Sequence, residues 1–224
     1  MWTPDGRRLV YSSVRDDGTR LLWRPSDGSS EPEPLLSSHD LLWPNAWTSD
    51  GQSLVYVEQL PTDKTELFVL RLNEGRRATP VVQGNSRHGT LSPDGHWLAF
   101  SEGEPVRSQV YAAPFPRVSS PQEVTVDGCR EATWRADGRE IFCRSGRRMY
   151  AISVEATSSV LSARKPVMLF EGPYITDDEH GLDYDLAPDG RFLMIKPNAD
   201  ELAPSAINVV LNWDQELKQR VPTR

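Results

Sequence analysis

Cysteine is scarce in this sequence, and long apolar runs are missing. Two cysteines, Cys129 and Cys143, are too few for the disulfide framework of a small secreted protein. No apolar run approaches the roughly 20 residues of a membrane-spanning helix, so we expect no membrane insertion. Residues 1–9 include charged side chains and lack the apolar centre of a signal peptide. The lack of a signal peptide and of a membrane-spanning segment predicts a cytoplasmic location by default.

A surplus of basic residues is also missing. The chain of 224 residues has 25 Lys and Arg against 32 Asp and Glu, a net charge of −7. An acidic balance of this size argues against binding to nucleic acid or to an anionic membrane. The basic pairs Arg76-Arg77 and Arg147-Arg148 are short, and we interpret them as solvated turns. We therefore expect no nucleic-acid partner.

Turn-forming and aromatic residues are plentiful instead. The chain has 18 prolines, 15 glycines and 7 tryptophans, and its 38% hydrophobic content is that of a globular protein. Many turns with aromatic residues between them favour an all-β fold.

One turn motif recurs along the chain. An Asp-Gly pair that is preceded by a Trp or Leu recurs along the chain. The intervals between the glycines of successive pairs are 45, 44, 43 and 52 residues. The five glycines are Gly6, Gly51, Gly95, Gly138 and Gly190. Asp bonds nearby backbone amides, and Gly adopts the left-handed conformation that closes a tight turn. A period near 40–45 residues is typical of a four-stranded propeller blade.

The strand predicted after each turn is continuously apolar, which is typical of a strand that is covered on both faces. These strands are residues 9–11, 54–56, 97–100, 141–143 and 192–195. A third strand follows in each unit, the fifth at residues 207–211, and only the first four units show an outer strand. A β-sandwich is the rival interpretation, but sandwiches do not repeat one turn at a fixed period.

We therefore predict an all-β protein, a β-propeller of five four-stranded blades of which the first and last are incomplete. The predicted domain covers residues 1–213, with blades at about 1–41, 42–84, 85–127, 128–171 and 172–213, and a polar tail at 214–224. The missing strands at both ends predict an open arc or a weakly closed ring. Exposed blade faces should favour self-association.

The pattern Trp/Leu-Ser/Thr-Pro-Asp-Gly-x-x-Leu-x-Phe/Tyr resembles the TolB-like, WD40-like Pro-Asp β-propeller repeat. Gln109–Pro116, Trp134–Phe142 and Ile207–Trp213 are similar to the C-terminal propeller of bacterial Ser/Thr protein kinases or winged-helix regulators. Kinase motifs, among them the His-Arg-Asp loop and Asp-Phe-Gly, are absent from the sequence. The resemblance implies a binding or sensing module of bacterial signalling.

From this resemblance we expect a non-catalytic module that binds a protein or peptide, not an enzyme, with no cofactor. Two alternatives stay open: a periplasmic TolB-like scaffold, and a hydrolase or lyase that uses the propeller channel.

Ligands of propellers bind by default at the rim where loops enter the inner strands. The repeat register places a mixed-charge set with two aromatic residues there, which suits a peptide better than a single small anion. The predicted rim residues are Trp43, Asn45, Arg87, His88, Arg130, Glu131, Asp183 and Tyr184.

Other groups carry weaker signals. Asp177-Asp178-Glu179-His180 is the densest ionisable cluster, but adjacent acids diverge, so we expect a solvated loop and no metal site. Gly84–His88 resembles a nucleophile elbow without its final glycine.

The two cysteines are predicted to be free thiols. If Ala132 pairs with Cys143 across the hairpin, then Cys129 lies three residues farther along its strand. At about 3.3 Å per residue the Cα atoms would be too far apart for a disulfide.

Overall fold

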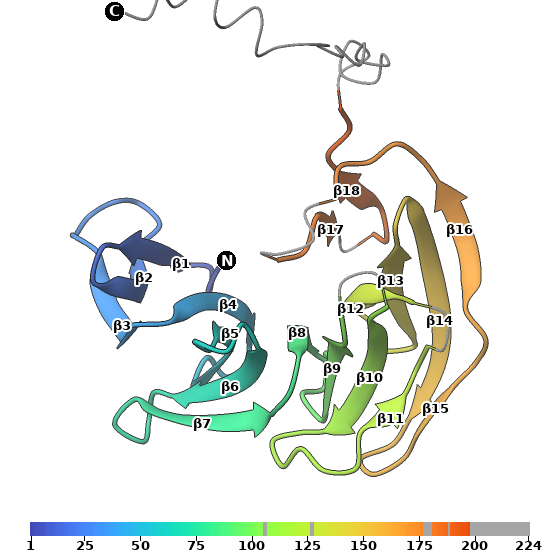
Figure 1. Cartoon of the computed structure of the whole chain (residues 1–224), viewed down its shortest axis with the longest axis horizontal. Coiled ribbons are helices and arrows are strands. Elements are labelled where there is room, and N and C mark those ends of the chain that lie inside the picture. Colours follow the sequence, from blue (N-terminus) through green and yellow to red (C-terminus); the bar gives the residue numbers. More distant parts are fainter. Residues whose placement is uncertain (105–106, 126–127, 177–180, 188, 198–224) are drawn as a thin grey trace, which may run out of the picture.

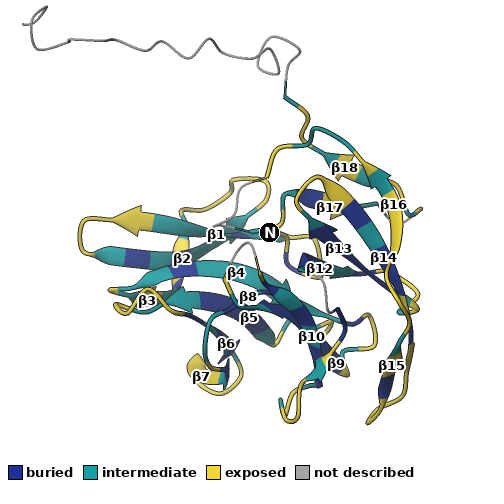
Figure 2. Cartoon of the chain, turned by 45° about the vertical axis from the view of Figure 1, so that its right-hand side comes forward, coloured by how far each residue is buried: buried dark blue, intermediate teal, exposed yellow. Residues whose placement is uncertain are grey.

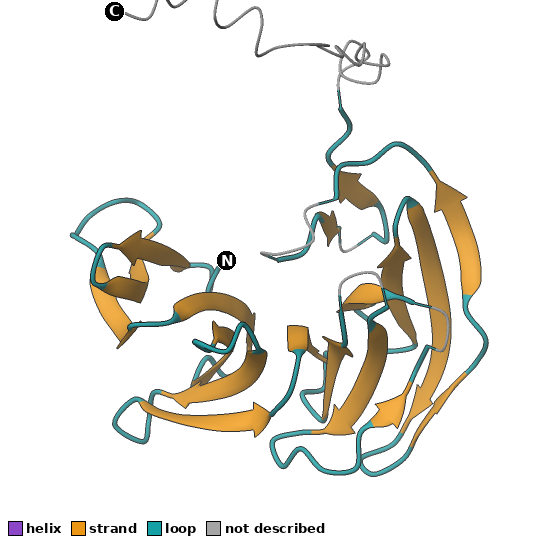
Figure 3. Ribbon diagram, viewed as in Figure 1, coloured by secondary structure: helices purple, strands orange, loops and turns teal. Residues whose placement is uncertain are grey.

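The computed structural model describes residues 1–104, 107–125, 128–176, 181–187 and 189–197. Every regular element in these ranges is a β-strand (Figure 3). The strands form five antiparallel sheets that follow one another along an arc, one sheet for each Asp-Gly turn (Figure 1). This confirms the prediction of an all-β propeller, and the open arrangement agrees with it.

We number the sheets as blades 1 to 5 in chain order. Blades 1 and 2 consist of β1 (Arg8–Arg15), β2 (Gly18–Pro25) and β3 (Glu33–Ser38), then β4 (Leu41–Trp47), β5 (Ser53–Gln59), β6 (Thr65–Arg71) and β7 (Arg77–Val82). Blade 3 consists of β8 (Ser86–Leu91), β9 (Trp97–Glu102), β10 (Gln109–Pro114) and β11 (Gln122–Glu123). Blade 4 consists of β12 (Arg130–Trp134), β13 (Glu140–Ser145), β14 (Arg148–Ala156), β15 (Leu161–Ala163) and β16 (Val167–Glu171). Blade 5 consists, in the described residues, of β17 (Tyr184–Leu186) and β18 (Phe192–Met194).

The Asp-Gly turns owe their shape to side-chain hydrogen bonds. In blade 2 the Thr48 hydroxyl donates to the Asp50 carboxylate at 2.6 Å, and the same carboxylate accepts the Gln52 N–H at 2.9 Å. Gly51 then closes the turn with a φ of +67°, which only glycine adopts without strain. The predicted turn chemistry is therefore confirmed, and a Ser or Thr two residues before the Asp reinforces it in blades 1 to 3.

The second strand of each central blade is covered on both faces, as predicted. In β5, Leu54 and Tyr56 pack toward blade 1, and Val55 and Val57 pack toward blade 3. The apolar core therefore consists of four clusters, each between two consecutive blades. Figure 2 shows these strand centres as buried, with exposed residues at turns and outer edges.

Within the described residues, the two end blades have fewer strands than the central blades. The inner strand of blade 1 is reduced to one bridge between Trp2 and Leu9. The predicted third strand of blade 5 (207–211), the tail (214–224) and the acidic cluster (177–180) lie outside the described residues. The short strand β15 was not predicted: it pairs with the end of β14, while β16 pairs with the beginning of β14.

The prediction of free thiols was wrong. Cys129 and Cys143 form a disulfide, with their Cα atoms 5.8 Å apart. The predicted register ignored a β-bulge between Arg130 and Thr133, where β12 has one residue more than β13. Arg130 consequently pairs with Arg144, which brings Cys129 one residue closer to Cys143 than a regular hairpin would.

Candidate functional site

The same irregularity recurs on three consecutive inner strands. β4, β8 and β12 each contain a bulge about six residues before the glycine of the turn. Bulges redirect side chains and are common beside functional sites. His88 in β8 and Glu131 in β12 adopt left-handed conformations, with φ of 55° and 57°. Such conformations are strained for residues with a long side chain and are held only by their surroundings.

Hydrogen bonds between blades hold these bulges. The Asn45 side-chain oxygen accepts the Gly89 N–H at 3.1 Å, and the Thr90 hydroxyl donates to the Ala132 carbonyl at 3.0 Å. The Tyr184 hydroxyl donates to the Glu131 carbonyl at 2.6 Å. Blades 2 to 5 are therefore linked in sequence along their inner strands, which face the middle of the arc (Figure 1).

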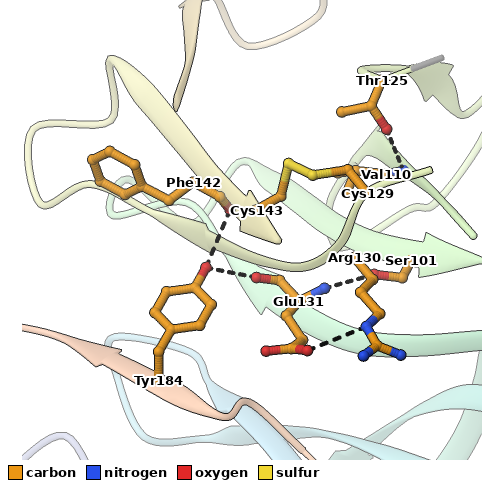
Figure 4. The surroundings of a disulfide bond; sticks show 9 residues. All are labelled: Ser101, Val110, Thr125, Cys129, Arg130, Glu131, Phe142, Cys143 and Tyr184. Carbon is orange, nitrogen blue, oxygen red and sulfur yellow. Dashed lines mark hydrogen bonds and ion pairs between the residues drawn. A yellow bond between two sulfur atoms is a disulfide. The ribbon is translucent and has the colours of Figure 1, made fainter. Parts of the chain in front are cut away.

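A buried charged group lies where blades 4 and 5 meet. The Glu131 carboxylate is 3.3 Å from Arg130 Nε and 3.7 Å from Arg144 Nη1, and it accepts the Asp183 N–H at 3.2 Å. Arg144 Nη1 is also 3.8 Å from the Asp183 carboxylate. Figure 4 shows Arg130 beside the Glu131 carboxylate and Tyr184 below the strand. We call Arg130, Glu131, Arg144, Asp183 and Tyr184 the Glu131 cluster.

Burial dominates the electrostatics of Glu131. Its side chain is fully buried, and the loss of water raises its pKa to about 7, although Arg144 and Arg130 act in the opposite direction. A carboxyl that titrates near neutrality can both accept and donate a proton at physiological pH. The cluster can therefore hold a proton and two fixed positive charges in one place.

A second part of the inner surface surrounds His88. Its neighbours Trp43, Asn45 and Arg87 line a cavity of about 10 Å³ with it, about the size of one water molecule. Burial, with Arg130 and Arg87 nearby, lowers the pKa of His88 to about 4. His88 is therefore neutral at pH 7, and its Nδ1 is buried without a hydrogen-bond partner.

The structure brings all eight predicted rim residues to the inner side of blades 2 to 5. Trp43, Asn45, Arg87 and His88 gather around the small cavity, and Arg130, Glu131, Asp183 and Tyr184 belong to the Glu131 cluster. His88, Arg130, Glu131 and Tyr184 are buried, whereas an open rim would expose them.

Arg144 was missed by the sequence analysis. It lies six residues after Gly138, at the position that Ser12 and Ser101 occupy in blades 1 and 3. Ser12 donates to the Leu42 carbonyl, and the Ser101 hydroxyl accepts the Glu131 N–H, so this position reaches the inner strand of the following blade. A charged residue directly after the apolar run 141–143 was the signal that could have identified it.

The remaining candidates carry little chemistry. Ser86, the serine of the elbow-like segment, is buried within β8 and pairs with Glu102. Within the described ranges, no group of three His, Cys, Asp or Glu side chains is placed to hold a metal ion. In those ranges no helix is long and apolar enough to cross a membrane.

Solved structures with the same fold are TolB-like propellers. TolB from Acinetobacter baumannii superposes with a TM-score of 0.62 at 18% identity, covering 84% of this chain and 45% of that chain. A puromycin-hydrolysing peptidase of Mycobacterium tuberculosis gives 0.60 at 17% identity, covering 84% and 35%. An oligogalacturonate lyase in complex with manganese gives 0.60 at 16% identity, covering 89% and 58%. The chain therefore has the fold of a TolB-like β-propeller.

In sequence, no protein-family model matches the chain. A curated relative, the uncharacterized peptidase YuxL of Bacillus subtilis (strain 168), is 22% identical over 212 residues. The match covers 89% of this chain, and the chain spans 29% of the length of that relative.

These findings correct the expectation of a non-catalytic module that is not an enzyme. The curated relative is named a peptidase, and the proteins that share the fold include a peptidase and a lyase. The names of these proteins back the hydrolase or lyase alternative better than the non-catalytic one. The expectation followed from the resemblance to the propellers of bacterial kinases and winged-helix regulators, and the comparisons show only the TolB-like propeller part of that resemblance.

Proposed function

We propose that this propeller belongs to a hydrolase that cleaves peptides, and that its inner surface binds the charged ends of the substrate. The observation that carries the proposal is the Glu131 cluster, in which acids and arginines of blades 4 and 5 meet beside the channel. The peptidase name of the curated relative supports the choice of substrate class.

The chemistry of a peptide fits this surface. A peptide has an ammonium group at one end and a carboxylate at the other. Asp183 is the more exposed acid of the cluster, at 16% of its side chain, and can pair with an ammonium group. Arg87 and Arg130 lie on neighbouring blades around His88, and arginine binds carboxylates through two parallel hydrogen bonds.

In this proposal the residues of the channel bind the substrate and transfer protons. The nucleophile belongs to residues outside the channel. Ser86 is enclosed in β8, and His88 is a neutral, buried ring. A serine nucleophile needs an exposed hydroxyl beside an accessible base.

The predicted link to kinases or winged-helix regulators, and with it a signalling role, stays a prediction. The coding sequence directly upstream tests it, because an in-frame kinase or winged-helix segment would support it and a signal sequence would oppose it.

The cytoplasmic location also stays a prediction, and the disulfide argues for another compartment. Disulfides persist mainly in oxidising compartments, so we propose that Cys129 and Cys143 form their bond outside the cytosol. Labelling thiols in whole cells and in fractionated cells distinguishes the two locations.

A kinetic experiment tests the proposed function. The protein, expressed as its gene encodes it, is assayed with short fluorogenic peptides that differ only in a free or acetylated N-terminus. We expect hydrolysis of the free peptides, and in Asp183→Asn a KM raised about fivefold for them with kcat nearly unchanged, because a carboxylate paired with an ammonium group contributes about 1 kcal/mol. For the acetylated peptides, the substitution should leave KM unchanged.

Asp185→Asn is the matched control, since Asp185 lies two residues after Asp183, is exposed on β17, and accepts a hydrogen bond from the Leu186 N–H. It should behave as the unsubstituted protein. Failure to hydrolyse any peptide, or equal effects of the two substitutions, would count against the proposal.

A further inference from the structure

The disulfide joins the two backbone segments that carry the arginines of the Glu131 cluster. Cys129 directly precedes Arg130 and Glu131, and Cys143 directly precedes Arg144. Both arginines form ion pairs with Glu131, at 3.3 Å and 3.7 Å. Figure 4 shows the sulfur bridge on one side of the strand and the Glu131 carboxylate on the other. One covalent bond therefore fixes the spacing of both positive charges around this acid.

The bond also spans the bulge that gives Glu131 its conformation. The bulge between Arg130 and Thr133 interrupts the ladder between β12 and β13, and Glu131 lies within it at a φ of 57°. A ladder that is interrupted at a strained residue resists opening less than a regular one does. A crosslink beside the interruption compensates for the missing pairing.

The other blades provide an internal comparison. The positions of Cys129 and Cys143 correspond, counted from the turn glycine, to Leu42 and Tyr56 in blade 2 and to Ser86 and Phe100 in blade 3. Leu42 and Tyr56 belong to one apolar cluster and need no covalent bond. Among the three bulged blades that the structure describes, the crosslink lies in blade 4, whose bulge holds a buried acid beside two arginines.

Building on the proposed function, we propose that the Cys129–Cys143 disulfide is a positioning element of the Glu131 cluster. Reduction of this bond then weakens the binding of peptides at the cluster. The reduction takes two electrons and two protons: a dithiol reductant is oxidised to its cyclic disulfide, and Cys129 and Cys143 each become a thiol. Cys129 is 4% exposed and Cys143 is not exposed, so exchange requires local opening of blade 4.

Groups from each neighbouring element face Glu131. They are Arg130 on β12, Arg144 on β13, and Asp183 and Tyr184 at β17. When the crosslink is lost, β12 and β13 can separate at the bulge, water reaches the carboxyl, and the main cause of its raised pKa weakens. The titration of Glu131 therefore reports the state of the crosslink without any assay of hydrolysis.

The experiment uses the full chain in three forms: oxidised, reduced with dithiothreitol, and the double variant Cys129→Ala/Cys143→Val, which keeps small apolar side chains in the core. The Glu131 carboxyl is followed by infrared difference spectroscopy over pH 4–9, and Glu131→Gln identifies its band. We expect the midpoint to fall by at least one pH unit in both crosslink-free forms, and KM for the free peptides to rise several-fold.

Near-ultraviolet circular dichroism shows that each form is folded. An unchanged midpoint in a folded, crosslink-free form would overturn the positioning role and leave a purely structural disulfide. If the midpoint moves while peptides are never hydrolysed, the proposed function fails and the link between disulfide and Glu131 stands. Should the double variant not fold, the reduced protein decides the question.

Discussion

Glu131 combines three features that rarely occur together in a residue: full burial, a left-handed backbone and two arginine neighbours. One oxygen of its carboxylate, Oε2, accepts a hydrogen bond from the Asp183 N–H, whereas Oε1 is buried without a hydrogen bond. An acid in such surroundings keeps its proton up to a higher pH than in the unfolded chain, where its pKa is near 4.5. This single residue thus links stability, charge and the proposed substrate binding.

The consequence is a contribution of Glu131 to stability that falls with rising pH. Since the pKa of Glu131 is raised to about 7 on folding, the folded state binds the proton more tightly, and this stabilising effect is lost between about pH 4.5 and 7. By this residue alone the free energy of unfolding should decrease by up to about 3 kcal/mol over that range. Urea unfolding at several pH values measures it. His88, whose pKa is lowered, contributes with the opposite sign, so the effect of Glu131 is read as the difference between the pH profiles of the unsubstituted protein and Glu131→Gln. The difference in their free energies of unfolding should change between about pH 4.5 and 7, and parallel profiles would contradict the assignment.

At the scale of strands and turns, much of the fold could be predicted from the sequence. The spacing of Gly6, Gly51, Gly95, Gly138 and Gly190 identified the blades, because an Asp-Gly turn has local chemistry that is readable without tertiary contacts. The apolar runs after the turns identified strands covered on both faces.

The bulges could not be predicted in the same way. The left-handed residue in the bulges at His88 and Glu131 is neither Gly nor Pro. Contacts from neighbouring blades hold the conformation of Glu131, so the sequence carries no local signal for it. The missed bulge in β12 shifted the register by one residue and hid the disulfide. Arg144 was missed for a related reason: its role depends on contacts with Ile175 and Asp183, which lie more than 30 residues farther along the chain, before β17.

The inter-blade hydrogen bonds at these bulges make a testable contribution. Asn45→Ala removes the acceptor of the Gly89 N–H. Because that N–H then loses its partner in a half-buried place, we expect a loss of about 1–2 kcal/mol in the free energy of unfolding by urea. Asn45→Asp keeps the acceptor oxygen and is the control. Equal losses in both variants would show that the hydrogen bond is not the cause.

As a whole molecule, the chain is an arc of stacked blades whose two ends are unlike its centre. Interior blades are covered on both faces, whereas blade 5 exposes Leu193 and Ile195 at 72% and 62%, and Trp2 at the start of blade 1 is 57% exposed. Such faces are consistent with the predicted self-association, which stays a prediction.

The inner surface and the turn surface of the arc offer different places for a ligand. The inner surface gathers the Glu131 cluster and the residues around His88. On the turn surface, blades 3 and 4 enclose a groove of about 1170 Å³, lined by the turns at Asp94 and Asp137 and by Trp97. The groove is larger, but the charges that can pair with both ends of a peptide lie on the inner surface.

The most direct test of the account is hydrogen exchange, measured by mass spectrometry on the full chain with and without a saturating short peptide that has free ends. We expect slower exchange at Ser86–Leu91, Arg130–Trp134 and Tyr184–Leu186, the inner strands β8, β12 and β17, and weaker protection in Asp183→Asn when the peptide concentration is lowered to the KM of the unsubstituted protein. Protection confined to the turns around Asp94 and Asp137 would contradict it.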